Sequence, residues 1–260
     1  MSIFCVSDLH LCNGGPRDNF AVRGVNRFRN FVDWVEHQDG ELVILGDLFD
    51  WWQSNLSASV KTYYGLLQQL DRLCPLYVFG NHDNALVEFI GEGLMPNIPV
   101  IRSAGGPFTR EIGGRRFAFL HGHEADTYCN SLNPGIGEIT AIMTALAEDK
   151  NNGPNSRGHV VEDSMISAME APLNLWRHLT LQSNRRDEMI DNVEKYRIEK
   201  KSDVVIYGHT HKVGRIGDYH YNTGQWCRDH DTFVRIDDDG SVHTFEWSDD
   251  HAEPLDKELR

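Results

Sequence analysis

The chain has 260 residues, 40% of them hydrophobic and 25% charged, which suits one large globular domain or one domain with an insertion. No apolar run approaches the ~20 residues of a membrane-spanning helix, and the first residues lack the basic leader of a signal peptide, so we expect a cytoplasmic protein. Acidic residues outnumber basic ones by 39 to 25, and the net charge of -14 argues against an extended nucleic-acid surface, which needs clustered Lys and Arg.

The first half of the sequence alternates short apolar segments with longer helical patterns. Three apolar segments are bounded by turn residues, as buried strands are, and cover residues 3–6, 42–45 and 76–79. Between them, segments 20–37 and 57–73 repeat apolar residues at helical spacing. These residues are Phe28, Phe31, Val32 and Val35 in the first segment, and Tyr63, Leu66, Leu67 and Leu70 in the second. The alternation predicts a parallel sheet with both faces covered.

The second half contains shorter strands and one different region. From residue 98 to 120 the strands shorten around Gly-Gly turns at Gly105 and Gly113, so a second sheet is expected to begin there. Residues from about 125 to 201 are helical in pattern, with Met189, Val193 and Tyr196 on one face. They form either an insertion that caps the site or ordinary covering helices. Strands return at 204–207, 219–222, 232–236 and 242–247, and we expect a single domain over residues 1–260.

Five short polar motifs stand where predicted strands end. They are DLH at Asp8, GDLFD at Gly46, GNHD at Gly80, HGH at His121 and GHTH at Gly208. The first three follow the predicted parallel strands, and open α/β sheets bind ligands at the carboxyl edge of such strands. The last two follow the strands that end at Leu120 and Tyr207.

The residue types in these motifs indicate metal binding. Asp, Asn and His supply oxygen and imidazole donors, which suit Mn, Fe, Zn, Co or Ni. The spacing His-x-His puts both imidazoles on one side of an extended segment, and an aspartate can bridge two ions that lie roughly 3.5–4 Å apart. The alternative, a set of buried polar groups that satisfy one another without metal, would be costly. The five cysteines are scattered and lack CxxC spacing, so we interpret them as reduced thiols rather than a disulfide frame or a zinc knuckle.

The ordered set DLH, GDLFD, GNHD, HGH and GHTH resembles the calcineurin-like metallophosphoesterases over essentially the whole chain. Within that superfamily, DLHL at Asp8, GDLFDWW at Gly46, NTGQW at Asn222 and the helical insertion are similar to the branch that contains UDP-2,3-diacylglucosamine diphosphatase. The lipid A pathway enzymes of that branch typically carry arginine where this chain has His82, so the substrate stays open. The resemblance implies an α/β fold, a four-layer αββα sandwich of two mixed sheets.

The resemblance also implies a role for individual residues. It implies two divalent ions, with manganese as the first choice and Fe, Zn, Co or Ni as alternatives. The implied ligands are Asp8, His10 and His211 for the first ion, Asn81, His121 and His209 for the second, and Asp47 as the bridge. His82 would be the catalytic histidine near the leaving group, and Asp50 would orient it. The alternatives are a structural role for His82 and a helix cap for Asp50.

Three neighbouring residues are left with two interpretations each. His123 either lines the pocket or stabilises its loop, and Trp51 and Trp52 either line the pocket or pack in the core.

The leading functional prediction is hydrolysis of a phosphodiester or pyrophosphate bond, in a nucleotide sugar similar to UDP-2,3-diacylglucosamine. The first alternative is a phosphomonoesterase, or a nucleotide or cyclic-nucleotide phosphodiesterase, of the same superfamily. A non-catalytic scaffold would be expected to lack ligands, whereas all seven positions are filled here. The expected partner is a phosphorylated small molecule or a lipid-linked substrate, and peripheral contact with a membrane stays open.

Overall fold

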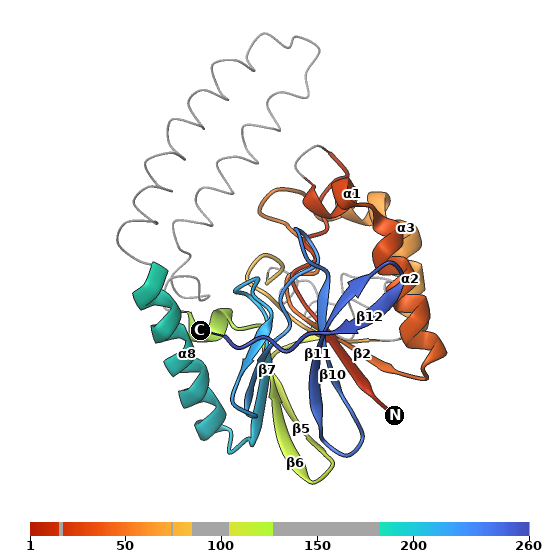
Figure 1. Ribbon diagram of the computed structural model, residues 1–260. Helices are drawn as coiled ribbons and strands as arrows, with labels where there is room; N and C mark the ends of the chain where they lie inside the picture. Colours follow the sequence, from red (N-terminus) through yellow and green to blue (C-terminus); the bar gives the residue numbers. More distant parts are fainter. Residues whose placement is uncertain (16–17, 74, 85–103, 127–181, 260) are drawn as a thin grey trace.

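The computed structural model describes residues 1–15, 18–73, 75–84, 104–126 and 182–259, apart from the side chains of residues 182–186. Two mixed sheets lie face to face, and helices cover their outer faces (Figure 1). This arrangement confirms the αββα sandwich expected from the sequence. Of the helical insertion predicted at about 125–201, residues 127–181 lie outside the described residues, so its role as a cap stays a prediction.

Seven strands form the first sheet. In spatial order they are β12 (His251–Pro254), β11 (Val242–Ser248), β10 (Thr232–Ile236), β1 (Ile3–Val6), β2 (Glu41–Leu45), β3 (Leu76–Val78) and β4 (Ala104–Gly105). Strands β1 to β4 are parallel, whereas β10, β11 and β12 continue the sheet from β1 in antiparallel pairs. All four residues of β1 are buried, as expected for a strand in a sheet that is covered on both faces.

Five strands form the second sheet. In spatial order they are β5 (Phe108–Ile112), β6 (Arg115–Phe119), β7 (Val204–Tyr207), β9 (His220–Asn222) and β8 (Gly214–Ile216). Strands β6, β7 and β9 are parallel, and the outer strands β5 and β8 are antiparallel to their neighbours. Every residue of the central strand β7 is buried, whereas β5, at the edge, has none that is fully buried.

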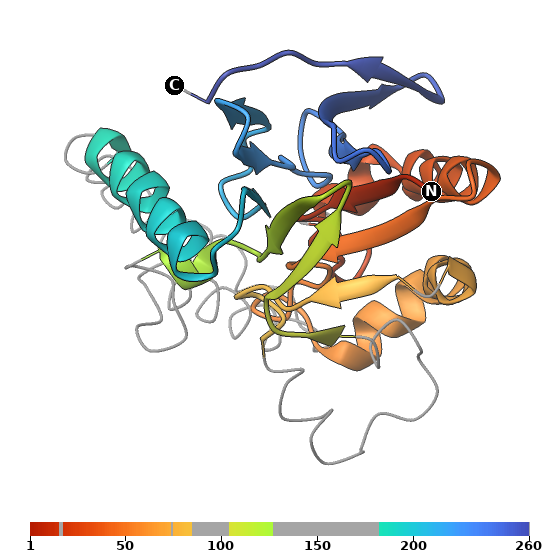
Figure 2. The same cartoon turned by 90° about the horizontal axis from the view of Figure 1, so that it is seen from below.

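Three apolar clusters separate the four layers. Between the sheets, Cys5 and Val43 of the first sheet pack with Ile206 of the second. On the outer face of the first sheet lie α2 (Val25–His37) and α3 (Leu56–Leu73), and all eight apolar residues predicted on their inner faces are buried. Burial of each such side chain contributes roughly 1.5–3 kcal/mol. On the outer face of the second sheet, α8 (Gln182–Glu199) packs Met189 and Val193, as predicted. Figure 2 shows α2 and α3 on the opposite side of the molecule from α8.

The helix predicted at 20–37 is wrong in one respect, because it is two helices. A short helix, α1 (Asn19–Arg23), ends before α2 begins at Val25. Gly24 between them has φ 95° and ψ 121°, a conformation outside the helical region that only glycine adopts without strain. The apolar spacing continues across this break, so periodicity alone did not detect it.

The second sheet begins later than predicted. The two-residue strand β4, at the Gly-Gly turn that was expected to open the second sheet, pairs with β3 and belongs to the first sheet. The backbone N–H of Phe79 also donates to the carbonyl of Gly105 at 3.0 Å. The second sheet starts with β5, which joins β6 through the Gly113–Gly114 turn. Short strands of similar composition do not reveal which neighbour they pair with, since pairing depends on distant parts of the chain.

The helices of the described segments are amphipathic or polar rather than apolar along their whole length. None of them combines the length and the apolar character needed to cross a bilayer.

Candidate metal centre

Five polar loops leave the carboxyl ends of parallel strands and meet at one edge of the two sheets. The loops after β1, β2 and β3 come from the first sheet, and those after β6 and β7 come from the second. They bring the seven predicted ligand residues together. The Asp8 cluster consists of Asp8, His10 and His211, the Asn81 cluster consists of Asn81, His121 and His209, and Asp47 lies between them.

Three donor atoms converge in the Asp8 cluster. The Oδ2 atom of the fully buried Asp8 accepts hydrogen bonds from the Ser7 hydroxyl and, at 3.0 Å, from the backbone N–H of His209. Its Oδ1 atom has no hydrogen-bond partner among the described residues and lies 3.1 Å from His211 Nε2. His10 Nε2 and His211 Nε2 are 3.2 Å apart. A buried carboxylate oxygen without a hydrogen bond is costly, and this oxygen with two imidazole nitrogens is a donor set that fits a divalent cation.

In the Asn81 cluster, a polar contact to one ring nitrogen orients each imidazole. His121 Nδ1 donates to the carbonyl of Leu45 at 2.7 Å, which leaves Nε2 facing the site, 3.1 Å from Asn81 Oδ1. His209 Nε2 lies 2.9 Å from Asp126 Oδ2, so its other nitrogen, Nδ1, is the atom left for a ligand. The two rings are 5.1 Å apart between centroids. Hydrogen bonds to the second nitrogen of a histidine orient the ring in metal sites, and both histidines of this cluster have one.

Asp47 contacts both clusters through a single oxygen. Its Oδ2 atom lies 3.4 Å from His121 Nε2 and 3.7 Å from His10 Nε2. Its Oδ1 atom accepts the backbone N–H of His82 at 2.9 Å, and this bond sets the rotation of the carboxylate. The position is the one that a carboxylate bridging two ions requires.

The backbone at the site is strained. Nine described residues other than glycine have positive φ, and five of them are predicted ligands: Asp8, His10, Asp47, His209 and His211, with φ between 51° and 67°. Left-handed backbone costs a residue other than glycine roughly 1–2 kcal/mol. Such outliers persist where the surrounding structure holds them and are concentrated at functional sites.

Two glycines allow the loops to approach closely. A Cβ atom on Gly46, which has φ 83°, would overlap the imidazole of His121, and one on Gly80 would overlap the carboxylate of Asp47. Any larger residue at either position would displace a predicted ligand.

The electrostatics of the site favour positive charge. Burial tends to raise the pKa of Asp8 and Asp47, but neighbouring histidines hold both well below the usual range. Burial lowers the pKa of His10 and His121, yet the carboxylates and other neighbouring groups outweigh it and raise the pKa values to about 9 and about 10. These neighbouring groups therefore favour the protonated form of His10 and His121, whereas burial lowers the pKa of His209. A bound divalent ion would supply that positive charge instead and release the protons.

The two predicted catalytic residues lie beside these clusters. His82 Nδ1 is 2.9 Å from Asp50 Oδ1, and His82 Nε2 is 4.0 Å from Asp47 Oδ2. Asp50 Oδ2 accepts from Gln53 Nε2 at 2.7 Å, which holds the carboxylate in place. Trp52 stacks on the His82 ring at 3.6 Å between centroids. His82 is thus fixed by a carboxylate and an aromatic face, with Nε2 directed toward the clusters.

Residues 1–213 match the calcineurin-like phosphoesterase family. The chain belongs to this family. The family identification agrees with the superfamily to which the sequence motifs pointed, and its name implies hydrolysis of phosphate esters.

Comparison with curated proteins finds no match for this calcineurin-like phosphoesterase. Among solved structures it is similar to a single mutant of Vps29 from Entamoeba histolytica, with 15% identity, 99% of each chain covered and a TM-score of 0.48. It is similar to a dimetal phosphatase from Danio rerio, with 14% identity, 95% of this chain and 99% of that chain covered and a TM-score of 0.47. An archaeal phosphodiesterase matches with 14% identity, the same coverage and a TM-score of 0.42. Similarities of this size assign neither a substrate nor a partner.

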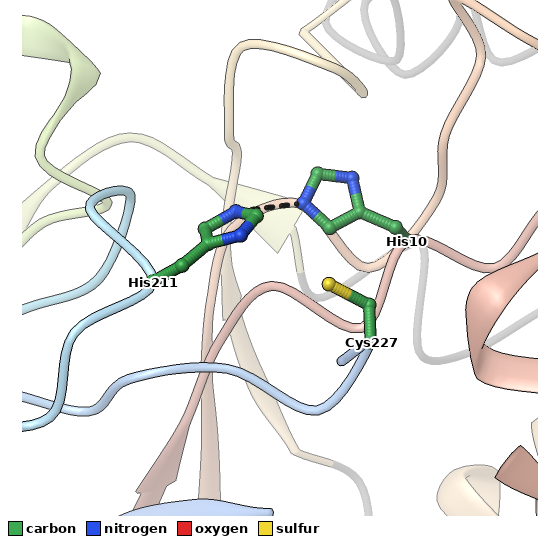
Figure 3. A group of neighbouring side chains, drawn as sticks. All are labelled: His10, His211 and Cys227. Carbon is green, nitrogen blue, oxygen red and sulfur yellow. Dashed lines mark hydrogen bonds between the residues drawn. The ribbon is translucent and has the colours of Figure 1, made fainter. Parts of the chain in front are cut away.

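Three residues at the site of this phosphoesterase were not singled out from the sequence as contributors to it. Asp126 orients His209, as described above. Cys227 directs its thiol toward His10 and His211 (Figure 3). Arg228, next to it, lines a cavity of about 160 Å³ together with His82. The HGHEAD segment could have suggested Asp126, but no spacing in the sequence relates Cys227 or Arg228 to the five motifs.

The structure places His123, Trp51 and Trp52, the three residues for which the sequence allowed two interpretations. His123 is buried beside His121, with 5.4 Å between ring centroids, and burial lowers its pKa to about 4. Trp51 stacks on Phe49 and packs against the core outside the first sheet, whereas Trp52 stacks on His82. One tryptophan therefore supports the core and the other supports the site.

Proposed function

We propose that the protein is a two-metal phosphoesterase that hydrolyses a phosphodiester or pyrophosphate bond. The observation that supports this most directly is the position of Asp47 Oδ2 between the two clusters. This oxygen lies 3.7 Å from His10 Nε2 in the Asp8 cluster and 3.4 Å from His121 Nε2 in the Asn81 cluster. A single carboxylate oxygen between two sets of imidazole and oxygen donors is the arrangement expected for a pair of ions.

The two clusters would each hold one ion. Asp8, His10 and His211 would bind the first, and Asn81, His121 and His209 the second, with Asp47 shared and manganese as the first choice of metal. When bound, the ions supply Lewis-acid polarisation of the phosphoryl oxygens and lower the pKa of water so that hydroxide forms near neutral pH.

The chain's own residues would handle the leaving group and the substrate charge. His82 would donate a proton from Nε2 to the leaving oxygen, because Asp50 occupies Nδ1 at 2.9 Å and fixes the ring. Arg228 lines the same cavity as His82 and would bind a phosphoryl oxygen of the substrate. Trp52, stacked on His82, would limit rotation of the ring during proton transfer.

The substrate class within this reaction has two candidates. The motifs DLHL, GDLFDWW and NTGQW support a nucleotide sugar similar to UDP-2,3-diacylglucosamine. The His82–Asp50 pair favours the second candidate, a simple phosphate ester. An alkoxide leaving group is strongly basic and needs a proton, whereas the phosphate released from a pyrophosphate is weakly basic and leaves without one. A built-in proton donor therefore helps ester cleavage more than anhydride cleavage.

The test is manganese-dependent hydrolysis of bis-p-nitrophenyl phosphate and p-nitrophenyl phosphate by the wild type and by Asp47→Ala. A matched control is Asp238→Ala, which removes a carboxylate that is 82% exposed, on the turn between β10 and β11. We expect turnover that requires metal, disappears in Asp47→Ala and persists in Asp238→Ala. The preferred substrate separates diesterase from monoesterase activity. Turnover that survives chelation of metal or the loss of Asp47 would contradict the proposal.

If both aryl esters are inert while two ions are bound, UDP-2,3-diacylglucosamine is the next substrate. Cleavage of that compound alone would support the nucleotide-sugar candidate. Inertness toward all three compounds with both ions bound would instead support a scaffold.

A further inference from the structure

The buried thiol of Cys227 lies at the Asp8 cluster, close to two of the proposed ligands. One sulfur and two imidazole nitrogens, from Cys227, His10 and His211, all lie within 4.8 Å of one another. The three residues come from separate loops, after β1, after β7 and between β9 and β10. In Figure 3 the sulfur points into the space between the two imidazole rings.

The backbone that carries Cys227 is tied to the cluster itself. The backbone N–H of Trp226 donates to the carbonyl of Asp8 at 3.1 Å. The Trp226 side chain is completely buried, and Arg27 donates to its carbonyl at 2.6 Å. One backbone hydrogen bond therefore ties the residue before Cys227 to the loop that carries Asp8.

A second observation points to a ligand at this place. Asp8 Oδ1 is completely buried and makes no hydrogen bond within the described segments. Asp8 Oδ1 is directed at His211, 3.1 Å from its Nε2 atom. Ligand bonds of about 2.0–2.3 Å place two donors of one ion roughly 3.3–3.8 Å apart. The sulfur and the two nitrogens are therefore within about one ångström of the separations that a shared ion needs.

The other described cysteines, Cys5 and Cys12, have surroundings that differ from those of Cys227. Cys5 is fully buried between the sheets, where it packs with Val43, Val234 and other apolar side chains as a small hydrophobic residue. Cys12 lines the same cavity as Cys227 but is not part of the three-residue group. Of the three described cysteines, Cys227 is the one whose sulfur faces imidazole nitrogens.

We propose that Cys227 is a further ligand, as thiolate, of the ion held by the Asp8 cluster. The inference rests on the proposed metal centre and adds a donor to it. Binding would form a metal–sulfur bond and release the thiol proton to solvent. Sulfur donors favour Zn²⁺, and oxygen donors favour Mn²⁺. The Asp8 cluster would then prefer zinc or cobalt more strongly than the Asn81 cluster, whose donors are nitrogen and oxygen.

The experiment is the absorption spectrum of the cobalt-substituted full chain, because a cobalt–thiolate bond gives a charge-transfer band in the near ultraviolet that nitrogen and oxygen ligands do not give. Wild type is compared with Cys227→Ser and with Cys12→Ser, a matched control from the same cavity. We expect the band in wild type and in Cys12→Ser and its loss in Cys227→Ser, with the visible cobalt bands present in all three. We also expect Cys227→Ser to lower Zn²⁺ affinity by about 10- to 100-fold, with a much smaller change for Mn²⁺.

Each other outcome is informative. Visible cobalt bands in wild type without the charge-transfer band would overturn the thiolate ligand and leave the metal centre standing, and this result needs no variant to fold. A band that disappears in Cys12→Ser and not in Cys227→Ser would overturn it as well. Failure of wild type to bind cobalt, zinc or manganese at all would overturn both this inference and the proposed function.

Discussion

In the Asn81 cluster each imidazole has a second partner, whereas in the Asp8 cluster the imidazoles face each other and a cavity. His121 is held by the Leu45 carbonyl at 2.7 Å, and His209 by Asp126 at 2.9 Å. His10 Nδ1 has no hydrogen bond within the described segments, and the His211 side chain is 25% exposed while that of His121 is completely buried. The comparison indicates a buried, pre-oriented cluster next to a more open one at which substrate would enter.

The largest expected effect comes from the residue that both clusters share. Replacing Asp47 with asparagine removes the charge opposite His10 and His121 while keeping the size of the side chain. We expect both ions to bind weakly and kcat/KM to fall by about 10³-fold or more, as when a main transition-state stabiliser is lost. Metal analysis after dialysis, together with turnover, measures both effects. Normal binding of two ions by the variant would show that the clusters are not joined through Asp47.

The second-largest effect is expected from the loss of His82, the proposed proton donor. His82→Gln removes the proposed donor and keeps all seven proposed ligands, so metal content should stay unchanged while kcat falls by about 10²- to 10⁴-fold. The loss should grow as the leaving group of an aryl phosphate series becomes more basic. Asp50→Asn should reproduce the trend more weakly, because Asp50 acts through His82. An equal loss for all leaving groups would mean that His82 does not donate a proton.

A more selective change separates the two clusters. Asp126→Asn weakens the support of His209 and leaves the Asp8 cluster intact. Calorimetric titration with Mn²⁺ should show one site weakened by about 10- to 100-fold and the other unchanged, the range seen when such supporting residues are lost. Equal weakening of both sites would mean that the clusters are not supported separately.

The smallest effect is expected at the mouth of the cavity. Arg228 is exposed and lines the cavity beside the Asp8 cluster. Arg228→Gln should raise KM by about 3- to 10-fold with little change in kcat, because an exposed charge contact with phosphate contributes modestly. Arg116→Gln, an exposed position on β6, is the matched control. A change in kcat with an unaltered KM would place Arg228 in the chemical step instead of substrate binding.

The site could be predicted from the sequence largely because strand ends are local features. Asp8 follows β1 directly, and the apolar run before it is buried as predicted. Parallel strands of one sheet end at one edge, so the loops that begin at Asp8, Gly46 and Gly80 were expected near each other. That Asn81 and His121 share a cluster was implied by the family resemblance, and the structure places Asn81 Oδ1 3.1 Å from His121 Nε2 although their loops follow strands of different sheets. Whether these residues hold metal stays a prediction.

The parts that could not be predicted depend on conformation or on distant contacts. Gly24 interrupts a helical pattern through its own backbone angles, which periodicity does not report. The C-terminal strand β12 and the short strand β8 are recognisable only through their partners β11 and β9. Cys227 and His10 meet because a buried tryptophan anchors one loop to another, a contact without a sequence signature.

The most direct test of the shared metal centre is electron paramagnetic resonance of the wild-type chain titrated with Mn²⁺. Two ions that share Asp47 Oδ2 would lie close enough for their spins to couple. We predict that two equivalents of Mn²⁺ bind and that the signal of isolated Mn²⁺ gives way to that of a coupled pair. Saturation at one ion, or two ions with uncoupled signals, would contradict a centre in which both clusters meet at Asp47.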